Sequence, residues 1–123
     1  MDIRSKIFLD LKNILSKYAD KLVESGNMES SYHLHGTIPA KVGKKNYDGI
    51  YFASAVIRTK SVALHFFPIY THVSEFDKID SKLKKCLKGK SCFHIKNDNE
   101  EIYKEIKNLL DLGLKVYRKE GWI

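Results

Sequence analysis

Apolar residues recur at three- and four-residue steps near the start of the chain, which is the spacing of one face of an α-helix. The series consists of Ile3, Ile7, Leu11, Ile14, Leu15, Tyr18, Leu22 and Val23. Gly26 and Asn27 follow, and both residue types accept the left-handed conformation that ends many helices. The pattern predicts an amphipathic helix over residues 3–23 that stops at Gly26 and Asn27.

The middle of the chain changes to the pattern of β-strands. Residues 47–57 are rich in β-branched and aromatic side chains, and residues 61–67 alternate around Val62, Leu64 and Phe66. The polar residues 58–60 join these two segments, which predicts a β-hairpin. Pro68 should end the second strand because it has no backbone N–H to donate to a ladder.

Shorter patterns fill the rest of the chain. Residues 32–35 and 91–95 have the composition of short strands, and residues 43–46 are typical of a polar turn. Residues 79–88 show a short helical pattern, and Gly89 is expected to end that helix as a C-cap.

The last helix is expected to begin at a capping box. Asp98 and Glu101 have the spacing at which each side chain can bond the other's backbone N–H. Helices set before and after hairpin-linked strands indicate an α+β fold. We therefore expect one domain over residues 1–123, with an antiparallel sheet of about four to five strands. The N- and C-terminal helices should pack on one face, in the order helix, strands, helix, strand, helix.

Composition narrows the class of protein. A chain of 123 residues fits one domain, and its 43% apolar content is typical of globular proteins. No apolar run approaches the ~20 residues needed to cross a bilayer, and the first residues lead into a patterned helix without a signal-peptide pattern. Cys86 and Cys92 are too few for a disulfide framework, so we expect reduced thiols, although a bridge across Gly89 stays open. These features favour a cytoplasmic protein without a membrane anchor.

The net charge of +7 raises the question of nucleic acid. The candidate residues for such a surface are Lys82, Lys85, Lys88 and Lys90. The 15 acidic residues spread among the 22 basic ones argue against nucleic acid as the main partner. Weak nucleic-acid binding is kept as an alternative function.

Histidine and cysteine residues indicate one face of the sheet as a candidate site. His33 and His35 share a face of one predicted strand, and Cys92 and His94 share a face of another, because side chains alternate along a strand. The opposite parity is more apolar and should face the helices. The expected ligand or partner face contains His33, His35, His65, Phe67, Tyr70, Cys92 and His94. Since imidazole and thiolate bind transition metals, His65, Cys92 and His94 are also candidate ligands for iron or zinc.

Motifs for catalysis are not found. Gly89-Lys90-Ser91 lacks the earlier glycine of a phosphate-binding loop and runs from a helix into a strand, which is the reverse of that motif. No serine stands in a nucleophile elbow, and the acidic residues lie mainly on helix surfaces. We therefore assign no catalytic residue and expect no cofactor.

The segment from Tyr51 to the end resembles a known family. It contains the hairpin Tyr51-Phe52-Ala53 and Val62-Ala63-Leu64-His65-Phe66-Phe67-Pro68, then Leu83-Lys84-Lys85-Cys86-Leu87-Lys88-Gly89-Lys90-Ser91-Cys92-Phe93, and it closes with Tyr117-Arg118-Lys119-Glu120-Gly121. This pattern is similar to the YdhG-like family of small bacterial domains of unknown function and covers about two-thirds of the chain. Some relatives are labelled frataxin-like iron chaperones, so the resemblance implies iron handling here.

Three hypotheses follow from the sequence. The first is a non-enzymatic binding or interaction module that uses the sheet face opposite the helices for a small ligand or a protein partner, with a homodimer possible. The second is a protein that handles iron or zinc. The third is a weak nucleic-acid binder.

Overall fold

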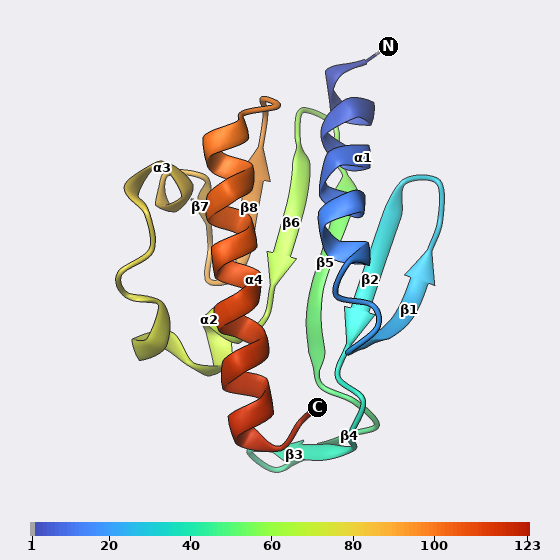
Figure 1. Cartoon of the computed structure of the whole chain (residues 1–123), viewed down its shortest axis with the longest axis vertical. Helices are drawn as coiled ribbons and strands as arrows, with labels where there is room; N and C mark the ends of the chain where they lie inside the picture. The colour runs from blue at the N-terminus through green and yellow to red at the C-terminus, as the bar shows by residue number, and fades with distance from the viewer. Residues whose placement is uncertain (1) are drawn as a thin grey trace.

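The computed structural model describes residues 2–123 and shows an antiparallel sheet with two long helices on one face (Figure 1). The main sheet has six strands in the order β1-β2-β5-β6-β8-β7. Its strands are β1 (Val23–Asn27), β2 (Ser31–His35), β5 (Tyr51–Ile57), β6 (Val62–Phe66), β7 (Leu87–Lys88) and β8 (Cys92–Ile95). A separate hairpin is formed by β3 (Ala40–Val42) and β4 (Lys45–Tyr47).

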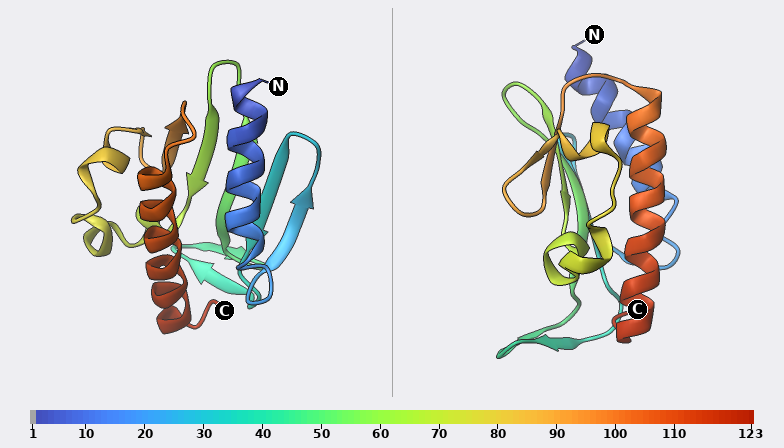
Figure 2. Two further views of the ribbon diagram at one scale, coloured as in Figure 1. Left: turned by 45° about the horizontal axis from the view of Figure 1, so that its top comes forward. Right: turned by 90° about the vertical axis from the view of Figure 1, so that its left-hand side faces the viewer.

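The two long helices are α1 (Ile3–Ser16) and α4 (Glu100–Glu120), and both lie on the same side of the sheet (Figure 2, right). The Tyr103 hydroxyl of α4 donates to Asp10 of α1 at 2.9 Å, and the hydroxyl of Tyr18, just after α1, donates to Asp111 of α4 at 2.7 Å. Their apolar faces and the inner side of the sheet form one hydrophobic core. Within residues 2–123, no helix is long and apolar enough to cross a membrane.

Short elements connect β6 to β8 at one side of the sheet. They are α2 (Pro68–Thr71), the 3₁₀ helix η1 (Val73–Phe76), α3 (Ser81–Lys84) and the two-residue strand β7. Pro68 occupies the first turn of α2, where its missing N–H costs no hydrogen bond.

The fold class is confirmed: the protein is α+β, with an N-terminal helix, an antiparallel sheet and a C-terminal helix. The hairpin of β5 and β6 and the strands β2 and β8 lie close to the predicted segments, although β5 begins at Tyr51 and Tyr47 belongs to β4. The expected count of four to five strands is wrong, because β1, β7 and the small β3–β4 hairpin are additional. These strands are short or exposed, so they carry little periodic signal.

The first helix is shorter than predicted. It ends at Ser16 and is followed by turns, so the expected stop at Gly26 and Asn27 is wrong, and both residues belong to strand β1. Leu22 extended the apolar series because it is buried in the core from the connecting segment. Leu22 is buried because the connecting segment lies beside the sheet. The spacing of apolar residues alone does not distinguish this burial from that of a residue on a helix.

Two further details differ around α3 and α4. The helical stretch expected over residues 79–88 is a single turn, and Gly89 lies in the β7–β8 turn at φ 72° instead of capping a helix. Asn99, and not Asp98, caps α4, since its side chain accepts from the backbone N–H groups of Glu101 and Ile102.

Gly113 sets how closely α4 approaches the sheet. A methyl group at this position would lie 2.7 Å from Cζ of Phe66 and 3.1 Å from Cε1 of Phe52. Both rings are fully buried and meet edge to face, with centroids 5.7 Å apart. The bare glycine backbone therefore rests directly on the aromatic layer of β5 and β6.

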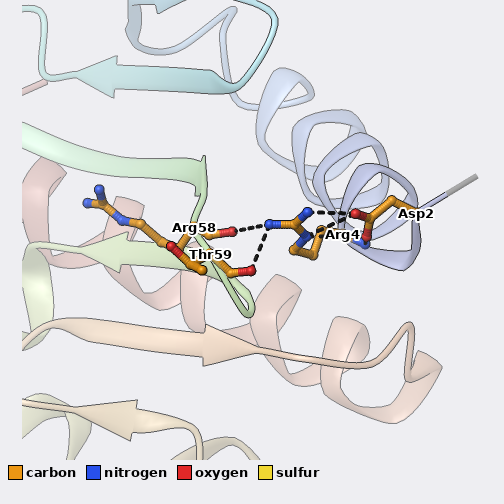
Figure 3. Close-up of polar contacts among 4 residues, drawn as sticks. All are labelled: Asp2, Arg4, Arg58 and Thr59. Atoms are coloured by element: carbon orange, nitrogen blue, oxygen red, sulfur yellow. Dashed lines mark hydrogen bonds and ion pairs between the residues drawn. The ribbon is translucent and has the colours of Figure 1, made fainter.

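Arg4 fastens the beginning of α1 to the turn between β5 and β6 (Figure 3). Its guanidinium donates to the backbone carbonyls of Arg58 and Thr59, both at 2.8 Å, and pairs with the Asp2 carboxylate at 2.6 Å. Hydrogen bonds from Arg4 lower the pKa of Asp2 to about 2, so the carboxylate stays charged and holds the guanidinium in place. The Arg58 side chain itself points away from α1 (Figure 3).

The contact at Gly113 yields a stability prediction. Replacing Gly113 with alanine should lower the free energy of unfolding by about 1–3 kcal/mol, because overpacking against two rigid rings exceeds the gain in helix propensity. Chemical denaturation of both proteins measures the difference.

The matched control is Asn108→Ala, at an exposed position of the same helix. This change should raise stability by about 0.5 kcal/mol through propensity alone. A gain of similar size for Gly113→Ala would contradict the close packing described above.

Candidate functional site

The candidate site is the sheet face opposite α1 and α4, here called the helix-free face. Phe66 and Phe93 point toward the helices, so the residues before and after them in each strand point the other way. The helix-free face is formed by His33, His35, Tyr51, Ser54, His65, Phe67, Cys92 and His94.

Strand register arranges four of these side chains in a row across the sheet. His33 lies opposite Ser54, Ser54 opposite His65, and His65 opposite Cys92. Directly opposite residues in antiparallel strands have Cβ atoms roughly 4.5–5.5 Å apart. The row therefore alternates imidazole with a small hydroxyl or thiol side chain, which leaves room for the larger rings.

Gly26 allows this row to reach the edge strand β1. A Cβ atom at Gly26 would lie 2.9 Å from Cδ2 of His33, closer than real Cβ contacts. The His33 ring thus covers the bare backbone of its partner strand. Another residue at position 26 would force the ring to move.

A second row of aromatic rings runs beside the first. His35 packs on Tyr51 at 5.1 Å between ring centroids, Tyr51 on Phe67 at 6.1 Å, and Phe67 stacks on Tyr70 at 5.5 Å. Lys90 ends the row, with its Nζ 5.6 Å from the Tyr70 centroid.

A β-bulge explains the direction of Tyr51. The register of β2 with β5 pairs Leu34 with Ala53 but His35 with Tyr51, so Phe52 has no partner in β2. The extra residue lets Phe52 face the core while Tyr51 lies on the helix-free face.

Arg58 brings a guanidinium to the imidazole row. Its Nη2 lies 3.4 Å from Nε2 of His65. A guanidinium can only donate, so His65 accepts at Nε2, and its imidazole is neutral with the proton on Nδ1. His94, two residues after Cys92 in β8, lies beside Ser61: its Nδ1 is 3.3 Å from the Ser61 hydroxyl.

The electrostatics of the face are one-sided. Burial lowers the pKa of His65, and the nearby positive charges of Arg58, His33 and His94 lower it further. Burial and His33 also lower the pKa of His35. None of the residues of β2, β5, β6 and β8 is an aspartate or a glutamate. The row thus places several groups that can be positive beside each other without a carboxylate from these strands.

The metal hypothesis gains no support from this arrangement. His65 and Cys92 are neighbours, and His94 lies two positions along β8, yet within residues 2–123 no three His, Cys, Asp or Glu side chains are grouped so that they could hold a metal ion. Burial raises the pKa of the Cys92 thiol, which keeps it protonated and a poor ligand. Cys86 and Cys92 are both free thiols.

The lysine candidates for nucleic acid lie on different short elements. Lys82, on α3, pairs with Glu101 of α4, and Lys85 directly follows α3. Lys88, in β7, lies opposite Cys92 of β8, and Lys90 lies over the ring of Tyr70. Nucleic-acid binding therefore stays a prediction from charge.

The structure thus brings together His33, His65, Cys92 and His94, and it places His35, Phe67 and Tyr70 in the adjoining aromatic row. Sequence reasoning did not include Tyr51, Ser54 and Arg58 in the site. Ser54 lies in a strand that is apolar on both parities, and Arg58 lies in a turn. The available signals were a lone serine within a hydrophobic strand and a lone arginine directly after it.

Comparison of this chain with models of known protein families, with curated proteins and with solved structures finds no match. The resemblance to the YdhG-like domains therefore stays a prediction, and the case for function rests on the site itself.

The depressed pKa of His65 predicts how stability depends on pH. The unfolded chain binds a proton near pH 6.5, whereas folded His65 resists protonation, so the free energy of unfolding falls as pH is lowered through about 6.5. His65→Gln removes this titration and should show a shallower fall, with the remainder from His35. Urea denaturation of both proteins between pH 7.5 and roughly 5 measures the slopes. Equal slopes would contradict the assignment.

Proposed function

We propose that this protein is a binding module that holds a small anionic ligand, bearing a carboxylate or phosphate group, on its helix-free face. The observation that carries the proposal is the cluster of His33, His65 and His94, on strands without an acidic residue, with Arg58 from the adjoining turn. A ligand that supplies negative charge would complement this cluster.

The contact between Arg58 and His65 indicates where the anion binds. The guanidinium presents paired donors that match the oxygens of a carboxylate or phosphate. In the free protein one of these donors is used on His65. An anion beside both residues would accept from the guanidinium and favour protonation of His65, which then donates as well. Binding at neutral pH should therefore take up a proton.

Two features support binding over catalysis or metal handling. The Cys92 thiol has a raised pKa, so it suits neither a nucleophile nor a metal ligand. The Ser54 hydroxyl is fully buried and bonded to the Tyr51 hydroxyl, which keeps it from acting as a nucleophile. What the face offers is a set of hydrogen-bond donors for an anion.

Isothermal titration calorimetry with citrate and with inorganic phosphate tests the proposal. Arg58→Gln should weaken binding by about tenfold or more, because a charge-assisted hydrogen bond contributes roughly 1.5–3 kcal/mol. Repeating the titration in buffers of different ionisation enthalpy should reveal proton uptake in the wild type that His65→Gln reduces.

Arg118→Gln is the matched control, since Arg118 is an exposed arginine on α4 and should leave affinity unchanged. Failure of both anions to bind at low salt, or equal loss in the Arg118 variant, would overturn the proposal. A short polyglutamate peptide that binds more tightly than citrate would make the partner an acidic protein segment.

A further inference from the structure

A second candidate site lies at the β7 edge of the sheet, away from the imidazole row. A groove of about 460 Å³ opens between α2, η1 and the β7–β8 turn. Its apolar lining consists of Ile69, Tyr70, Val73, Phe76, Ile79 and Leu87. This volume falls in the range of small-molecule sites, which are usually concave, mostly apolar and provided with a few polar groups.

The groove exposes apolar side chains that the fold does not cover. Val73 is 67% exposed and Tyr70 is 49% exposed, and both line the groove. Deeper in the groove, Phe76 is buried and packs against the core ring of Phe66 with centroids 5.3 Å apart. The floor of the groove is therefore packed against the core, while its mouth exposes apolar surface to water.

The polar groups of the groove are unequal in charge. Lys84 and Lys90 contribute two positive charges, and Asp77 contributes one negative charge. Lys90 is held near the mouth, with Nζ over the Tyr70 ring at 5.6 Å. An apolar cavity with a net positive rim complements an apolar molecule that carries one anionic group at its end.

We propose that this groove binds an aliphatic carboxylate, with its hydrocarbon chain against Val73, Phe76 and Leu87 and its carboxylate between Lys84 and Lys90. The groove shares Tyr70 and Lys90 with the end of the aromatic row, but Arg58 and His65, which carry the proposed anion site, do not line it. It adds a second ligand class to the protein: a medium-chain fatty acid as distinct from a compact polar anion.

Titration of the full chain with octanoate tests this proposal. Binding is measured by calorimetry and by the chemical shifts of methyl groups in the groove. One octanoate should bind per chain. Val73→Glu should weaken binding by about tenfold or more, because it removes apolar contact and places a like charge at the mouth. Val23→Glu is the control: Val23 is also an exposed valine, at 46%, on the edge strand β1, and its replacement should leave affinity unchanged.

Octanol separates the chain contribution from the carboxylate contribution. The double variant Lys84→Gln, Lys90→Gln should weaken octanoate by roughly two- to fivefold, as expected for exposed ion pairs, and leave octanol unchanged. Equal affinity of the wild type for octanol and octanoate would overturn the assignment of a carboxylate. No binding of octanoate, or equal binding to the Val73 variant, would overturn the site.

The same variant tests whether a second copy of the chain occupies the groove. Sedimentation of the wild type across a concentration series should give the monomer mass at all concentrations. A dimer that Val73→Glu converts to a monomer would show that another protein chain covers this groove, which overturns the small-ligand proposal.

Discussion

The seating of α4 on the sheet, through the bare backbone of Gly113 over Phe52 and Phe66, determines much of the rest of the molecule. Once Phe66 faces the helix, the alternation along β6 must turn His65 to the opposite face. The antiparallel register then carries this choice to the neighbouring strands, from His65 to Ser54 and Cys92. One packing contact on the covered side thereby selects the chemical groups on the open side.

The helix-free face and the helical side differ in how their charged and titratable groups are arranged. Burial lowers the pKa of His65, a nearby guanidinium and two imidazoles lower it further, and the four strands beneath them contain no carboxylate. On the helical side, by contrast, Asp10 and Asp98 both pair with Lys6. The helix-free face thus carries groups that can become positive without a carboxylate from these strands, and the proposed anion site rests on this imbalance.

Much of the fold could be predicted because its signals are local. The alternation of β6, the apolar stripe of α4 and the link at residues 58–60 each follow from neighbouring positions. Strand β1 could not be predicted, since its residues are mostly exposed and its place depends on pairing with β2. For the site, parity placed the histidines on the correct face, but the contact of Arg58 with His65 and the bulge at Phe52 depend on register, which a single sequence does not encode locally.

The hydrogen bonds of Arg4 to the turn between β5 and β6 link opposite sides of the molecule. Arg4 holds the backbone of Arg58 from the helical side, while the Arg58 side chain meets His65 on the other side. The turn that carries the Arg58 guanidinium into the proposed anion site is thus held by the first turn of α1. A change that breaks these hydrogen bonds at the start of α1 would loosen the turn that carries Arg58, on the far side of the sheet.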